Sequence, residues 1–154
     1  MKKHLCLLAC VLLAAPVFLY SQTAAAIEEL LYTNAVSKQQ AAWLVLEAAD
    51  ISGPAGIYSP AQAFLHAVEQ QWFPAGARAN DRVRLDQVSL LVMRSFNIRG
   101  GIFFRLTGSP HYAFRELTAR GIIAGITFPR MTVSGYELLF IVNRVLAFAE
   151  ADLL

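Results

Sequence analysis

The feature that most constrains this fold is an internal repeat with a period near 50 residues. Similar sequence segments begin at Val36, Val83 and Val133, and each leads into an apolar stretch with helical spacing. A second element, Ser-Pro-x-x-Ala-Phe, occurs at 59–64 and again at 109–114. Repeats of this length build stacked or ring-packed helical units, none of which can bury its apolar face alone. We therefore expect a helical scaffold, and such scaffolds bind ligands more often than they catalyse reactions.

Each unit is predicted to contain a short helix, a loop and a longer helix. The Ser-Pro pairs are helix starts, because serine can accept a hydrogen bond from a free amide and proline fits the first helical position. Ser37-x-x-Gln40 and Ser134-x-x-Glu137 are capping boxes that begin two of the longer helices. Arg84 stands where the middle unit would have serine, so Asp81 or Asp86 is expected to cap that helix.

The longer helices carry the predicted core. In the last one, apolar side chains follow the i, i+3, i+4, i+7, i+8 pattern of a single wide face. The aligned core positions are Ala41/Val88/Leu138, Trp43/Leu90/Phe140 and Leu44/Leu91/Ile141. We expect an all-α fold in which three helix–loop–helix units, about 27–53, 59–100 and 109–149, surround a shared core. Short extended pieces are expected at 102–104 and 122–123.

The first 26 residues have the features of a secretory signal peptide. Lys2 and Lys3 precede an apolar run at 5–20, and alanines at 24–26 satisfy the Ala-x-Ala cleavage rule. Cleavage between Ser21 and Ala26 would leave a domain at 27–154. Lipidation at Cys10 and a permanent membrane anchor are weaker alternatives, because the apolar run continues past Cys10 and is short for a spanning helix. We expect an exported protein of a bacterial periplasm or cell envelope.

Removing that segment changes the charge and the thiol content. Both cysteines, Cys6 and Cys10, would be lost, which excludes disulfides and thiolate metal sites from the processed protein. Basic and acidic residues would then balance at 11 each. A neutral chain gives no electrostatic reason to expect nucleic-acid binding.

No catalytic pattern is found in the sequence. His66 and His111 lack partners at metal-ligand spacing, and no nucleophile elbow, phosphate loop or dinucleotide fingerprint occurs. The spacing of Glu137 from Ser134 favours capping over glycoside hydrolysis. The sequence therefore predicts no enzyme activity, no cofactor and no metal.

Aromatic residues could provide stacking surfaces for sugars. Trp43 and Trp72 align with apolar positions of the repeat and are predicted to be core. Tyr58, Tyr112 and Tyr136 are the better exposed candidates, and Phe103 and Phe104 are candidate exposed apolar residues.

The order of these elements resembles the S-layer homology family. The resemblance is strongest at Arg120-Gly121-Ile122-Ile123-Ala124-Gly125 and at Val133-Ser134-x-x-Glu137-Leu138, which are similar to the family's Gly-Ile-Ile-x-Gly and Ile-Thr-Arg-Ala-Glu-Phe motifs. It implies three units in a pseudo-threefold domain that binds cell-wall polysaccharide in grooves between units. The family's motif arginine is replaced by Lys38, Leu85 and Gly135, while a late arginine is kept as Arg94 and Arg144.

The resemblance implies a non-catalytic envelope-binding module. Its partner would be cell-wall polysaccharide or peptidoglycan, bound in inter-unit grooves. The expected groove residues are Lys38, Arg84, Arg94, Glu137 and Arg144. The alternative is a periplasmic protein–protein interaction module, with an envelope protein as partner, that has kept the scaffold and lost sugar recognition.

Overall fold

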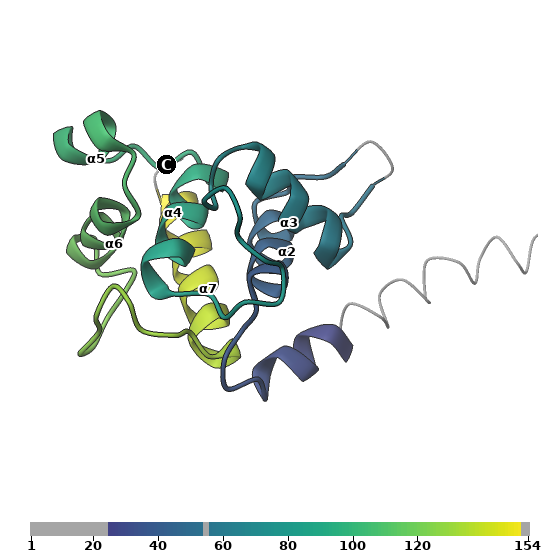
Figure 1. Ribbon diagram of the computed structural model, residues 1–154. Helices are drawn as coiled ribbons and strands as arrows, with labels where there is room; N and C mark the ends of the chain where they lie inside the picture. The colour runs from purple at the N-terminus through teal and green to yellow at the C-terminus, as the bar shows by residue number, and fades with distance from the viewer. Residues whose placement is uncertain (1–24, 54–55, 152–154) are drawn as a thin grey trace, which may run out of the picture.

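The fold is all-α, as the sequence predicts. The computed structural model describes residues 25–53 and 56–151. A first helix spans 25–31. It is followed by α2 (Lys38–Ala48), α3 (Pro60–Glu69), α4 (Leu85–Ser95), α5 (Ile102–Thr107), α6 (Pro110–Ala119) and α7 (Gly135–Ala151) (Figure 1). Extended pairing in this described part is limited to isolated β-bridges.

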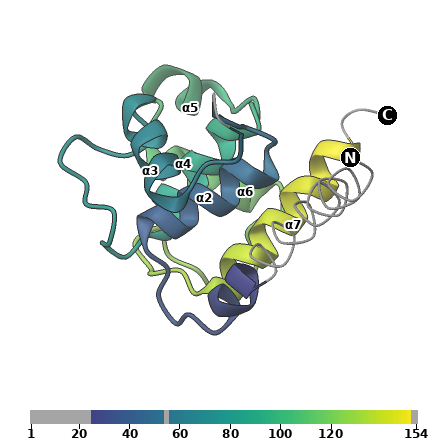
Figure 2. The same ribbon diagram turned by 90° about the vertical axis from the view of Figure 1, so that its right-hand side faces the viewer.

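The three longer helices, α2, α4 and α7, pack against one another, and α7 lies along one side of the molecule (Figures 1 and 2). Among the shorter helices, α3 packs on α2, and α6 packs on α4. Helix 25–31 lies at the start of α7, where the Gly135 amide donates a hydrogen bond to the Thr33 carbonyl at 2.8 Å. Thus α3 and α6 each pack on the long helix that precedes them in the chain.

The segments that precede these long helices meet in a closed ring of backbone hydrogen bonds. The amide of Val36 donates to the carbonyl of Val133 at 2.9 Å, that of Val83 to Val36 at 2.8 Å, and that of Val133 to Val83 at 3.4 Å. All three valines are buried. Buried backbone groups need partners, and this ring satisfies them between segments far apart in the sequence.

The predicted core is largely confirmed. The equivalent residues Leu44, Leu91 and Ile141 are all buried, and so are Ala41, Val88 and Leu138. The prediction for Phe140 is wrong, because 46% of this side chain is exposed although its counterparts Trp43 and Leu90 are buried. The reason lies in the packing of the shorter helices, since α3 and α6 cover α2 and α4 while helix 25–31 lies at the first turn of α7 (Figure 2).

Both predicted capping boxes are present. The Ser37 and Gln40 side chains bond each other's backbone amides, and Ser134 and Glu137 do the same. The expected cap of α4 is wrong. The Arg84 amide instead donates to Gln87 Oε1 at 3.1 Å, because Asp81 and Asp86 pair with Lys38 and Arg84.

Residues 102–104 belong to α5 and are not extended. The amide of Gly101 donates to Glu116 Oε1 at 2.9 Å, and Gly108 ends the helix with a left-handed φ of 58°. Phe104 is buried, contrary to the expectation that it is exposed. Ile122 and Ile123 are buried in the loop after α6 and form no strand.

Residues 1–24 lie outside the described residues. They include the candidate lipidation site Cys10 and all but the last two residues of the predicted signal peptide. Within the described ranges, none of the helices has the length and apolarity needed to cross a membrane.

Candidate functional site

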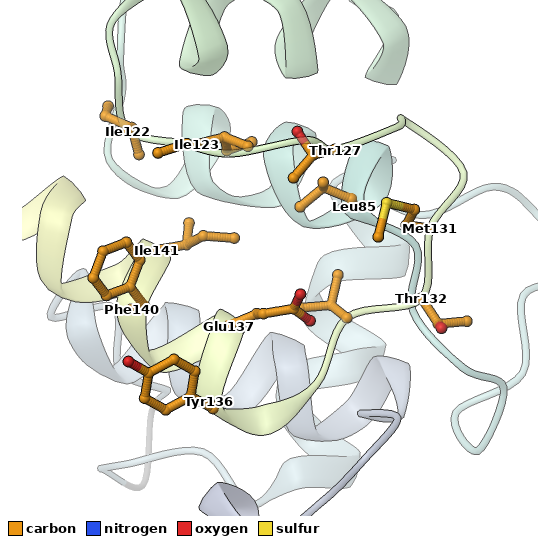
Figure 3. Close-up of a pocket in the computed structure, with 12 residues that line it drawn as sticks. Leu85, Ile122, Ile123, Thr127, Met131, Thr132, Tyr136, Glu137, Phe140 and Ile141 are labelled. Carbon is orange, nitrogen blue, oxygen red and sulfur yellow. The ribbon is translucent and has the colours of Figure 1, made fainter.

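A groove lies between α7 and the loop that connects α6 to α7 (Figure 3). Its cavity volume is about 80 Å³. Its floor is made of buried apolar side chains, while hydroxyl groups and aromatic rings lie nearer to solvent. The lining residues are Leu85, Ile122, Ile123, Ala124, Thr127, Met131, Thr132, Val133, Tyr136, Glu137, Phe140 and Ile141.

The loop wall of the groove is held in place by its backbone. Gly121 and Gly125 have φ values of 70° and 88°, which glycine adopts without the strain that a side chain would cause. Further along, the Met131 carbonyl accepts a hydrogen bond from the Leu85 amide at 2.8 Å. The groove therefore has a fixed wall anchored to the start of α4.

An aromatic ladder, formed by Tyr136, Phe140 and Arg144, runs along α7 beside the groove. Residues four apart lie on the same face of a helix. The rings of Tyr136 and Phe140 stack with centroids 6.4 Å apart and planes 16° apart. The guanidinium carbon of Arg144 lies 5.3 Å from the centroid of the Phe140 ring, within the range of a cation–π interaction. With Tyr136 65% exposed, the ladder presents flat apolar faces beside a cation.

Glu137 is the one carboxylate that lines this groove. Its Oε2 atom accepts hydrogen bonds from the amide and the hydroxyl of Ser134, both at 2.8 Å. A carboxylate at a helix N-terminus is also stabilised by the helix dipole. Glu137 therefore caps α7 and forms part of the groove wall at the same time.

Lys38, another predicted site residue, is buried and does not line this groove. Its Nζ atom lies 2.9 Å from Asp81 Oδ2, which links the start of α2 to the loop before α4. The hydrogen bond from Lys38, together with one from the Arg78 amide, lowers the pKa of Asp81 below its ordinary value. The charge of Lys38 is thus compensated within the protein.

Two predicted arginines are also engaged within the protein. Arg84 makes a two-pronged contact with Asp86, in which Nε lies 3.0 Å and Nη2 2.9 Å from the carboxylate oxygens. The guanidinium of Arg94 lies over the Phe104 ring, 5.4 Å from its centroid. Of the five predicted site residues, the structure brings only Glu137 and Arg144 to the groove beside α7.

A second pocket, with a cavity volume of about 90 Å³, lies at the end of α2. Its lining includes Trp43, Glu47, Asp50 and Tyr58. Glu47 Oε2 is buried without a hydrogen-bond partner among the described residues, and burial raises the pKa of this carboxyl above its ordinary value. Glu47 is not among the residues indicated by the sequence, although it aligns with Arg94 and Arg144 in the sequence repeat.

The remaining aromatic and histidine candidates are partly buried or engaged in contacts with each other. Tyr58 and Tyr112 are partly buried, which leaves Tyr136 as the exposed member of the three predicted tyrosines. His66 Nδ1 lies 3.3 Å from the Tyr58 hydroxyl oxygen, and the His111 ring meets the edge of Tyr112. Across residues 25–53 and 56–151, no three or more His, Cys, Asp or Glu side chains gather in a way that could hold a metal ion.

Comparison with protein-family models, with curated proteins and with solved structures gave no match to this chain.

Proposed function

We propose that this protein is a non-catalytic binding module of the cell envelope, and that cell-wall glycan binds in the groove beside α7. The observation that carries this proposal is the exposed aromatic ladder of Tyr136, Phe140 and Arg144. Sugar rings have an apolar face that packs on flat aromatic rings. Arg144 and the hydroxyls of Thr127 and Thr132 offer hydrogen bonds to sugar hydroxyls or carboxylates.

The proposed scaffold is a pseudo-threefold domain of three units, similar to the S-layer homology family. The ring of hydrogen bonds among Val36, Val83 and Val133 supports it, since each valine begins one of the repeated segments. The equivalent burial of Leu44, Leu91 and Ile141 supports it as well. In such a scaffold the groove beside α7 lies in the third unit, and Leu85 of the second unit contributes to its lining.

The size and the chemistry of the groove favour binding without cleavage. A cavity of about 80 Å³ is far smaller than the roughly 300–1,000 Å³ of pockets that enclose small molecules. It suits one ring of a longer chain that lies across the surface. Glycoside hydrolysis normally uses two carboxylates, whereas Glu137 is the one carboxylate in the lining and is engaged as a helix cap.

A protein partner is the second candidate. The observation in its favour is the apolar floor of the groove, together with the neighbouring exposed side chains of Ile126 and Phe128. An apolar side chain of an envelope protein would bury these surfaces, and binding energy in protein interfaces is concentrated in such contacts.

Co-sedimentation with purified cell-wall sacculi tests the glycan proposal. Tyr136→Ala and Phe140→Ala are each expected to weaken binding by roughly tenfold, which corresponds to about 1.4 kcal/mol. Leu65→Ala, at an exposed position on α3 away from the groove, is the matched control and is expected to bind like the wild type. Wild-type protein that does not co-sediment with sacculi would contradict the proposal. Crosslinking to one envelope protein that is lost in Phe140→Ala would favour the second candidate.

A further inference from the structure

Helix α5 exposes three large apolar side chains to solvent. The exposed fractions are 79% for Ile102, 65% for Phe103 and 81% for Leu106. The helix lies at one end of the molecule and packs against α6 (Figure 1). Exposed apolar side chains gathered in so short a segment mark an interaction site on a protein surface.

The helix presents these side chains in a fixed direction. Successive residues of a helix are rotated by about 100°, so Ile102, Leu106 and Phe103 share one face and Phe104 points to the opposite side. Phe104 is buried beneath the guanidinium of Arg94. The Phe103 ring is stacked on Tyr112 of α6, with centroids 5.5 Å apart. The apolar face is therefore supported from below and directed outward.

Basic side chains predominate along the chain around α5, and one carboxylate, that of Glu116, contacts the start of the helix. Between Asp86 and Glu116 the chain contains Arg94, Arg99, Arg105 and Arg115 and no acidic residue. Arg99 and Arg105 are exposed immediately before and within α5. The nearest acidic residue along the chain, Glu116, is engaged with the Gly101 amide at 2.9 Å and with Arg120 at 3.7 Å. Among the described residues, neither Arg99 nor Arg105 forms an ion pair within the protein.

We propose that α5 docks this protein onto the surface of a bilayer that contains anionic phospholipid. Ile102, Phe103 and Leu106 would enter the boundary between headgroups and acyl chains, while Arg99 and Arg105 would contact lipid phosphates. Apolar side chains combined with basic residues are the two contributions that hold amphipathic segments at anionic membranes. The charge complementarity selects lipid phosphate over a neutral partner. The site is separate from the groove beside α7 and does not depend on what that groove binds.

Vesicle binding with a site-specific readout tests this proposal. The whole protein is mixed with vesicles of phosphatidylglycerol and phosphatidylcholine, or of phosphatidylcholine alone, with lipids brominated on the acyl chains. Leu106→Trp places an added fluorophore on α5, and Leu65→Trp is the matched control on α3. We expect brominated anionic vesicles to quench the tryptophan at position 106 and to leave the one at position 65 unquenched.

Two further variants separate the apolar and the electrostatic contributions. Phe103→Ser is expected to weaken binding to anionic vesicles on the order of tenfold, because one large side chain no longer leaves water. Arg105→Glu is expected to weaken it similarly, and added salt should weaken it further. Circular dichroism checks that each variant is folded. Equal quenching at positions 65 and 106, equal binding to neutral and anionic vesicles, or full binding by folded Phe103→Ser would each overturn the proposal.

Discussion

The backbone carbonyl of Leu30 occupies the space where a side chain on Gly135 would begin. The Gly135 amide meanwhile donates to the Thr33 carbonyl at 2.8 Å. The equivalent repeat positions are held by Lys38 and Leu85, both of which are buried side chains. Glycine at this position therefore lets helix 25–31 approach α7 closely, whereas the aligned sequence positions carry the side chains of Lys38 and Leu85.

Gly135→Ala should consequently destabilise the protein. The added methyl group meets backbone atoms, which cannot rotate away as a flexible side chain can. Overpacking of this kind costs about 1–3 kcal/mol. Asn143→Ala, on the exposed side of the same helix, should change the free energy of unfolding by about 0.5 kcal/mol or less. Chemical denaturation measures both variants, and equal stabilities would show that the Leu30–Gly135 contact is not tight.

Leu91→Ala should cost on the order of 2–5 kcal/mol of unfolding free energy, as large-to-small changes in a packed core do. Leu91 is fully buried at the centre of α4, in the position that corresponds to Leu44 and Ile141. Leu106→Ala removes the same atoms from an exposed position and serves as the control. A Leu91→Ala protein as stable as the control would contradict the central packing of α4.

The ion pair between Lys38 and Asp81 should give the protein an acid-sensitive stability. The pKa of Asp81 is held below its ordinary value of 3.8, so the folded state binds this proton less tightly than the unfolded state does. The stabilising contribution is complete above the ordinary pKa and is lost as the pH falls through the lowered one. Asp81→Asn should flatten this part of the stability profile, and Asp50→Asn, at an exposed position, is the control. Denaturation of each variant between neutral and strongly acidic pH measures the difference.

Glu47 should have the opposite effect on stability. Burial raises the pKa of Glu47 above its ordinary value of 4.5, so the folded state binds the proton more tightly and loses stability as the pH rises through this range. Glu47→Gln removes the cost of a buried carboxylate and should make the protein more stable at neutral pH, with the advantage shrinking in acid. Glu69→Gln, exposed on α3, is the control. A Glu47→Gln protein that is less stable at neutral pH would indicate that the carboxylate has an unrecognised partner.

The sequence predicts those parts of the fold that depend on local signals. Serine caps and helical periodicity place α2, α3, α6 and α7, and the repeat alignment finds the buried position of Leu91. The errors arise where long-range contacts decide the structure. Residues 102–104 are helical, and the Gly101 amide that precedes this helix is bound by the side chain of Glu116, 15 residues further along the chain. Tertiary contacts of this kind override local propensity. Likewise Asp81 pairs with Lys38 instead of capping α4 as expected.

The candidate site shows the same division. Tyr136, Glu137 and Arg144 are indicated by the sequence and lie on α7 at or beside the groove. The sequence does not indicate Phe140 as a site residue, because the repeat alignment places it with Trp43 and Leu90. The burial of those two residues depends on the packing of α3 and α6. The engagement of Lys38 and Arg84 with nearby carboxylates is a matter of tertiary geometry, which residue spacing does not reveal.

The most direct test of the proposed function is an NMR titration of the protein with soluble cell-wall glycan fragments, with amide shifts followed residue by residue. We predict saturable shifts confined to Tyr136, Phe140, Arg144 and the loop at 121–131, and their loss in Phe140→Ala. Shifts centred on the second pocket around Trp43 and Glu47, or no saturable shifts at any fragment concentration, would contradict it.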